Sequence, residues 1–173
     1  TTTLKASGGD YSLMSTWEST EQTNLVTDGD SHVLECDAFE CVDSVSILGW
    51  TTGASNFITI KPAAGAEHDG SDVTTGFRLK PNTIYSLGLK IKQRYTVVEG
   101  IGIDCTANTT TRGIELSDSA GYIIAKRLII EGSYNRGIYI ISPNSTAQNC
   151  RVVMATSGTN GTYFAPAVAG AAN

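Results

Sequence analysis

Between residues 76 and 140 the chain reads Gly76-Phe-Arg-Leu79, Gly88-Leu-Lys-Ile91, Gly100-Ile-Gly-Ile103, Gly113-Ile-Glu-Leu116 and Gly137-Ile-Tyr-Ile140. Each tetrapeptide is a glycine followed by an apolar, a variable and an apolar residue. The first three steps between their starts are nearly equal, and the last step is twice as long, so a copy missing near residue 125 would complete the series. This alternation is typical of a strand with one buried face, and glycine allows a sharp turn before it. Regular repetition predicts units that bury their apolar faces against their neighbours.

The short step between these strands leaves no room for a helix between them. Two strands per coil give a repeat of about 24 residues, which places Gly88, Gly113 and Gly137 in one column and Gly76 and Gly100 in another. This geometry is typical of an all-β parallel β-helix. The alternative is an antiparallel sandwich with regular hairpins, which also has short strands separated by turn signals.

Three longer β-rich runs favour the β-helix. They are Tyr95–Asp104, Tyr122–Glu131 and Ala147–Met154. Their apolar ends, at Ile101, Leu128 and Val152, are separated by two steps of similar but unequal length. The unequal spacing predicts loops of unequal length between coils.

Residues 1–31 have a different pattern and are predicted to cap the fold. Ser12–Gln22 reads as a short amphipathic helix with Ser12 as its N-cap and Leu13, Met14 and Trp17 on one face. An open end of a β-helix exposes an unpaired strand edge and part of the core, so a helix laid over it would protect both. We interpret Trp17 as a plug of this cap.

Residues 32–155 form the predicted β-helix. Its first strands are His32–Cys36, Val45–Trp50 and Phe57–Pro62, and the small, polar stretch 63–72 is expected to be a lateral loop. Residues 156–173 lack a strand period and are predicted to form a closing turn, the aromatic pair Tyr163 and Phe164, and a flexible tail.

Composition limits the classes of partner. The 173 residues fit one domain, only 17% of them are charged, and the net charge is −5. No Lys/Arg cluster could follow a phosphate backbone, so we expect no nucleic-acid partner. No apolar run approaches the ~18 residues of a membrane-spanning helix, so we expect a soluble chain without a membrane contact.

The four cysteines form no CxxC pair and have no histidine at metal-ligand spacing, so we expect no metal and no cofactor. Cys36 and Cys41 could close a small loop by a disulfide, and the sequence leaves their redox state open. Cys105 and Cys150 are separated by nearly two coils, which is too far for a disulfide. We expect them to be buried thiols.

The opening Gly8-Gly-Asp-Tyr-Ser-Leu-Met-Ser-Thr-Trp-Glu18, followed by His32–Cys36, Ile47–Thr52 and Phe57–Ile60, resembles a family of right-handed β-helix proteins of tailed bacteriophages and prophages. The run Tyr95–Ile103 and the tetrapeptides at Gly113 and Gly137 resemble that family's repeat. The likeness covers most of residues 8–155. It implies a single-stranded right-handed parallel β-helix in a virion surface component, from head or tail, rather than a particular chemistry.

A catalytic β-helix needs acids that project from neighbouring strands on one face. The best candidates are Asp104, Glu115 and Glu131, because Asp104 and Glu131 occupy equivalent strand ends. No histidine or Arg-x-Lys arrangement accompanies them, and an ordinary solvated edge explains them better. His32 and His68 lack a nucleophile partner and are interpreted as plain surface or turn residues. We therefore predict no enzyme.

Aromatic side chains are the best candidates for a contact surface. Tyr122, Tyr134 and Tyr139 fall in the last coils, and Tyr139 stands at the variable, outward position of its tetrapeptide. A glycan or another subunit could use this surface.

The leading hypothesis is a rigid decoration or attachment module on a phage virion, contacting other capsid or tail proteins. Virion symmetry predicts a homo-oligomer, with a trimer as the first expectation. The first alternative is a tail protein that binds or cleaves carbohydrate, and the second is an extracellular filament or adhesin subunit. The sequence does not choose between head and tail.

Overall fold

Parallel β-strands dominate the computed structural model, which describes residues 1–82, 87–107, 112–133 and 135–155. Two helices lie near the N-terminus of this part of the chain, α1 (Met14–Glu21) and α2 (Leu25–Asp28). Every pairing between the named strands is parallel, so the antiparallel sandwich is wrong and the all-β class is confirmed.

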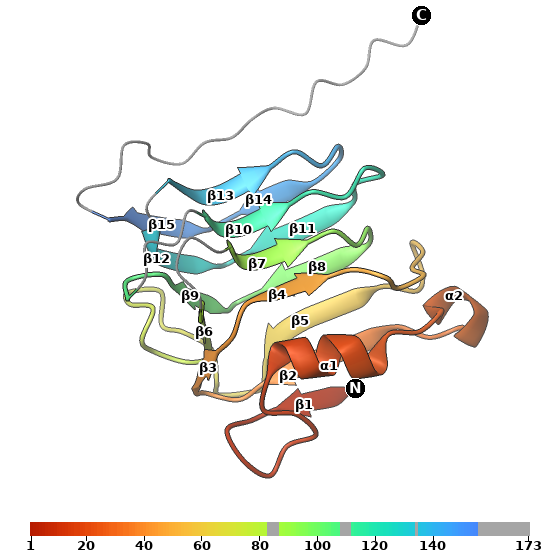
Figure 1. Ribbon diagram of the computed structural model, residues 1–173, viewed down its shortest axis with the longest axis horizontal. Helices are drawn as coiled ribbons and strands as arrows, with labels where there is room; N and C mark the ends of the chain where they lie inside the picture. The colour runs from red at the N-terminus through yellow and green to blue at the C-terminus, as the bar shows by residue number, and fades with distance from the viewer. Residues whose placement is uncertain (83–86, 108–111, 134, 156–173) are drawn as a thin grey trace, which may run out of the picture.

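The strands belong to three sheets (Figure 1). The six-stranded sheet has the order β1 (Thr2–Leu4), β2 (His32–Cys36), β5 (Ile58–Pro62), β8 (Thr96–Glu99), β11 (Ile123–Lys126) and β14 (Thr146–Gln148). The five-stranded sheet has the order β15 (Arg151–Met154), β12 (Ile129–Ser133), β9 (Gly102–Asp104), β6 (Arg78–Lys80) and β3 (Glu40–Val42). The four-stranded sheet has the order β13 (Arg136–Ile140), β10 (Arg112–Leu116), β7 (Leu87–Ile91) and β4 (Val45–Ile47). From β2 onward, successive strands enter the six-, five- and four-stranded sheets in turn.

Each repeat therefore contains three strands, where the sequence predicted two. The run Tyr95–Asp104 is divided into β8 and β9, and Tyr122–Glu131 is divided into β11 and β12. The chain turns between the two members of each pair, at Gly100 with φ of 67° and at Arg127 with φ of 53°. An apolar run that continues through a corner gives no sign of the bend, which is why the sequence pattern merged the two strands.

The predicted glycine columns agree with the register. Ile114 pairs with Leu89 on one side and Ile138 on the other, so the glycines before these residues align. Arg127 takes the position of Gly100 in the next repeat, because the register opposes Ile129 to Gly102. Arg127–Ile130 is thus the copy missing near residue 125. The column Ile101, Leu128, Val152 is wrong at its last member, since Val152 pairs with Ile130.

The glycines serve two purposes. Gly76 and Gly100 have positive φ and make turns. Gly113 lies within β10, where a Cβ would stand 2.3 Å from Ile130 Cγ2 and 2.7 Å from the carbonyl oxygen of Gly137. The glycines within strands are therefore needed because the neighbouring strands lie too close for a Cβ, and not because the backbone turns there.

All three sheets contribute inward side chains to one hydrophobic cluster that includes residues from Leu4 to Ile140. Stretch 63–77 contains no strand, as expected for a lateral loop. The loop reaches the corner at Arg127, where His68 Nε2 lies 2.6 Å from the Arg127 carbonyl oxygen. The predicted closing turn and tail, residues 156–173, lie outside the described residues.

Helix α1 packs against β4, the edge strand of the four-stranded sheet, at one end of the molecule (Figure 1). Met14 and Trp17 are fully buried, whereas Leu13 is 40% exposed and does not share their face. The N-cap residue is Leu13 rather than Ser12, and it makes no side-chain cap. Asp43, from the β3–β4 turn, instead accepts a hydrogen bond of 2.7 Å from the Ser15 amide. Residues 1–31 also supply β1, which extends the six-stranded sheet.

The plug predicted at Trp17 is part of an aromatic cluster. The Trp17 ring lies 5.8 Å from the His32 ring and 5.7 Å from the Trp50 ring. Trp17 Nε1 donates to His32 Nε2 over 3.2 Å, and Trp50 Nε1 donates to Glu18 Oε2 over 2.9 Å. His32 therefore begins a strand, as predicted, but it is partly buried in this cluster and is not a plain surface residue.

Candidate functional site: an aromatic groove

Two of the three acids predicted as a catalytic face are brought together as expected, and the third is not. Asp104 and Glu131 are opposed in the five-stranded sheet, whereas Glu115 lies in the four-stranded sheet. Asp104 accepts hydrogen bonds from the amide and hydroxyl of Thr106, and Glu131 pairs with Arg151. Each of these carboxylates already has a partner within the chain.

Glu115 is ionised and shared between two cations. Its oxygens lie 2.8 Å from Lys90 Nζ and in contact with Arg112 Nη1, and the residue is only 2% exposed. Burial alone would raise the pKa of Glu115, but the hydrogen bonds and charges of Lys90 and Arg112 outweigh it and hold the pKa below its usual range. A general acid needs the opposite shift, so Glu115 is unsuited to that role.

The predicted tyrosines occupy different surfaces. Tyr122 lies at the six-stranded sheet and Tyr139 at the four-stranded sheet, while Tyr134 lies outside the described residues. The Tyr139 ring is in cation–π contact with two guanidinium groups, 4.4 Å from that of Arg112 and 4.1 Å from that of Arg136. These contacts compete with a sugar for the ring.

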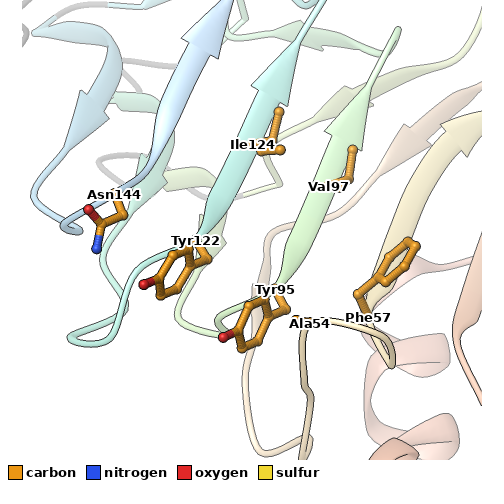
Figure 2. Close-up of a pocket in the computed structure, with 7 residues that line it drawn as sticks. All are labelled: Ala54, Phe57, Tyr95, Val97, Tyr122, Ile124 and Asn144. Atoms are coloured by element: carbon orange, nitrogen blue, oxygen red, sulfur yellow. The ribbon is translucent and has the colours of Figure 1, made fainter. Parts of the chain in front are cut away.

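Tyr122 lies in a groove of about 290 Å³ on the outer side of the six-stranded sheet (Figure 2). We call this the aromatic groove. Its lining is mostly apolar and consists of Ala54, Phe57, Tyr95, Val97, Tyr122, Ile124 and Asn144. Tyr122 is the one lining residue that the sequence had marked as a candidate contact residue.

Register explains how distant residues meet in the aromatic groove. Ile58 pairs with Thr96, and Thr96 pairs with Ile123. The residues that precede these three, Phe57, Tyr95 and Tyr122, therefore occupy equivalent positions at the start of β5, β8 and β11. One step further along the strands, Val97 pairs with Ile124, which supplies the aliphatic part of the lining.

The two tyrosine rings are stacked. Their centroids are 5.1 Å apart and their planes differ by 7°. Figure 2 shows the rings side by side with both hydroxyls pointing the same way. Tyr122 remains 48% exposed, so much of the stack is accessible to a ligand. The rings provide flat apolar contact, and the hydroxyls provide polar contacts at the same place.

The backbone holds these tyrosines in an unusual conformation. Tyr95 has φ of 52°, Tyr122 has φ of 62°, and Asn144, at the equivalent position before β14, has φ of 52°. The left-handed region suits glycine and asparagine and is costly for bulky residues. The corner before the strand requires this conformation, and asparagine, as at position 144, adopts it readily. Tyrosine at two of the three positions places rings on the surface and lowers the stability of the fold through backbone strain.

The groove has the chemistry of a binding site. Its lining offers two phenols and one amide, and no carboxylate, imidazole or thiol. General acid–base or nucleophilic catalysis needs such groups within hydrogen-bond reach of the substrate. The arrangement therefore supports recognition by contact.

Cys36, Cys41, Cys105 and Cys150 are free thiols. Burial raises the pKa of Cys41 to about 11 and that of Cys36 well above its ordinary value. In the part of the chain that the structure describes, no group of three or more His, Cys, Asp and Glu residues could hold a metal ion. No helix among the same residues is long and apolar enough to cross a membrane.

Comparison with protein-family models, with curated proteins and with solved structures finds no match to this chain.

Proposed function

We propose that this chain is a rigid, non-catalytic attachment module of a tailed-phage particle, built as a single-stranded right-handed parallel β-helix. Two features support that architecture. The strands enter three parallel sheets in a fixed cyclic order, and paired positions recur at a nearly constant step along the chain, as from Leu87 to Arg112 to Arg136. The sequence resemblance to β-helix proteins of tailed phages supports the particle. The trimer expectation depends on virion symmetry alone.

The observation that carries the attachment role is the aromatic groove. Tyr95 and Tyr122 occupy left-handed backbone positions, where asparagine would have a lower conformational energy. Their stacked rings line an open, mostly apolar groove. Rigid aromatic residues are common at binding hot spots because they bury a large area with little loss of side-chain entropy. The parallel sheets behind them hold the rings in place before a partner arrives.

A specific observation also favours the second candidate, a carbohydrate-binding tail protein. The groove combines apolar ring surface with two phenolic hydroxyls and the Asn144 amide, which matches the alternating apolar and hydroxyl-bearing surface of a sugar. In this version of the proposal, the groove contacts a glycan on the host surface. Cleavage has no support, because Glu115 lies on a different sheet from the opposed pair Asp104 and Glu131, and all three acids are engaged with neighbouring side chains.

Two measurements test the proposal. Mass spectrometry of purified particles from the source phage should detect the chain as a virion component. Purified chain should also adsorb to host cells or to their isolated polysaccharide, and Tyr122→Asn should weaken this adsorption about tenfold, as expected for loss of one aromatic hot spot.

Tyr122→Asn suits this test because Asn144 occupies the equivalent corner position with the same backbone conformation. The variant loses a ring stack worth about 0.5–1.5 kcal/mol but relieves a strained position, so its fold should persist. Val153→Asn is the matched control, since Val153 is exposed on β15 away from the groove. Particles that lack the chain would refute the virion role. Equal adsorption by both variants would refute the groove.

A further inference from the structure

The outer face of the six-stranded sheet is ordered in three rows that cross its strands. Alternate residues of each strand point outward, and the parallel register aligns them from one strand to the next. The aromatic row consists of Ser31, Phe57, Tyr95, Tyr122 and Asn144. The aliphatic row consists of Val33, Thr59, Val97 and Ile124. The charged row consists of Glu35, Lys61, Glu99 and Lys126.

The first two rows leave large apolar side chains on the surface. Phe57 is 37% exposed, Tyr122 is 48% exposed and Ile124 is 36% exposed. All three line the aromatic groove, so their exposed surfaces are neighbours. Exposed apolar groups that gather in one place indicate a contact surface.

The charged row makes this face electrically neutral. Lys61 lies 3.0 Å from Glu35, and Lys126 lies 2.7 Å from Glu99. The two glutamates and two lysines of the strands in this sheet cancel, whereas the whole chain has a net charge of −5. Two acidic copies of the chain could therefore approach each other through this face with little repulsion.

The order of the charges is self-complementary. From β2 to β11 the row reads negative, positive, negative, positive, and in the reverse direction it reads positive, negative, positive, negative. A second copy placed face to face, with its repeats running in the opposite direction, therefore opposes each glutamate to a lysine. A shift by one strand would oppose like charges, so the row also specifies the register.

The same arrangement matches the apolar rows. A two-fold axis parallel to the strands and centred between β5 and β8 places each row against its own counterpart. Phe57 of one copy then lies opposite Tyr95 of the other, and Val33 lies opposite Ile124. Copies with repeats running in the same direction would oppose the aromatic row to the charged row, which buries charge against apolar groups.

We infer that a second copy of this chain docks on the outer face of the six-stranded sheet and forms an antiparallel two-fold pair. The same surface serves both copies, so the assembly closes at two. Six strands about 4.8 Å apart, with five residues each on the face, give a footprint about 24 Å long and about 13 Å wide. An area of this size fits a weak, reversible pair. Pairing should therefore depend on concentration.

This inference rests on the proposed function and deepens it, because it names a second copy as the partner at the aromatic groove. A pair presents every other surface of the module twice. Two host contacts held together bind more tightly than one. Tyr122→Asn would then weaken adsorption because it breaks the pair.

Sedimentation of the full chain over a range of micromolar concentrations tests the pairing. The unmodified chain should change from monomer to dimer as its concentration rises. Ile124→Lys should raise the dissociation constant at least about tenfold, because it places a charge in the aliphatic row. Val153→Lys is the matched control, since Val153 is 40% exposed on β15 of the five-stranded sheet and the substitution adds the same charge. It should leave pairing unchanged.

A charge exchange tests the antiparallel register. Lys61→Glu and Glu99→Lys should each pair about fivefold more weakly than the unmodified chain, because each variant opposes like charges in its own pair. An equimolar mixture of the two variants should regain pairing, since each glutamate again meets a lysine of the other copy. Circular dichroism and thermal melting establish that every variant is folded.

A chain that stays monomeric at all these concentrations, or that forms a trimer, would overturn the inference. Equal effects of Ile124→Lys and Val153→Lys would overturn the face, and a mixture that pairs no better than its components would overturn the antiparallel arrangement. A monomer whose adsorption still depends on Tyr122 would refute pairing and leave the groove as a direct host contact. Pairing of a chain that purified particles lack would refute the virion role alone.

Discussion

At the scale of single residues, His32 shows how burial controls a titrating group. Its ring packs against Trp17 and Trp50, and its Nε2 accepts a hydrogen bond from Trp17 Nε1. Burial lowers the pKa of His32, and the charge of Glu21 only partly opposes this. Protonation would also replace the Nε2 acceptor by a second donor facing the indole N–H.

We therefore expect the free energy of unfolding to fall as the pH drops through the histidine range. A base with a lowered folded-state pKa binds protons more tightly when unfolded, so its contribution is complete above the ordinary value of about 6.5 and is lost below it. Urea unfolding at a series of pH values measures this. His32→Gln should flatten the profile between about pH 5 and 7. An unchanged profile in His32→Gln would contradict the prediction.

The αL tyrosines are the other residue-scale feature, and here the sequence contained a usable signal. Tyr95 and Tyr122 both begin β-rich runs, and they have the same separation along the chain as Ile101 and Leu128. Alignment of the two runs would have placed the tyrosines side by side. Phe57 was out of reach, because its place depends on a register with β8 that no repeat in the sequence marks.

At the scale of elements, the strands were easier to predict than the corners and caps. Glycine within a strand leaves a visible mark because any Cβ would meet the neighbouring chain, as at Gly113. The corner at Arg127 needs a left-handed residue but contains no glycine, so the sequence hid it. β1 has only three residues, too few for a period-two pattern to stand out.

The cap of α1 was also hidden, because it comes from a distant part of the chain. Asp43 is buried and accepts hydrogen bonds from the amides of Ser15 and Ser44, at 2.7 Å and 2.8 Å. Local reading placed the cap at Ser12, the nearest residue of a suitable type. A carboxylate at a helix N-terminus satisfies an amide that otherwise lacks a partner and interacts favourably with the helix dipole.

We expect Asp43→Ala to lower the free energy of unfolding by about 1–2 kcal/mol, because it removes this cap and deprives two half-buried amides of their acceptor. Denaturant unfolding followed by circular dichroism measures the change. Asp37→Ala is the control, since the Asp37 carboxylate makes an exposed ion pair of 3.6 Å with Lys5. Its effect should stay within about 0.5 kcal/mol. Equal effects of the two substitutions would show that Asp43 acts through charge alone.

At the scale of the whole molecule, the two ends of the sheets differ. At the β1 end, α1 packs over the edge strand β4, and Met14, Trp17 and Trp50 are buried with the core. At the other end, β14 and β15 have mainly exposed or half-buried residues. Among the residues that the structure describes, the buried hydrophobic cluster ends at Ile140, and Ala147, Cys150 and Val152 pack against it from beyond. Local stability should therefore decrease along the chain toward β15.

Native-state hydrogen exchange measures this gradient directly. Amides of β7 and β10, with paired strands on both sides and fully buried Leu89 and Ile114, should open only through global unfolding. Amides of β14 and β15 should exchange through a local opening. The free energy of this opening should be lower than that of global unfolding by about 2 kcal/mol or more, because few apolar contacts are lost when these edge strands separate. Strand β2, near α1, should resemble β7. Uniform protection from β2 to β15 would instead show a single cooperative unit, in which the last strands are held as firmly as the first.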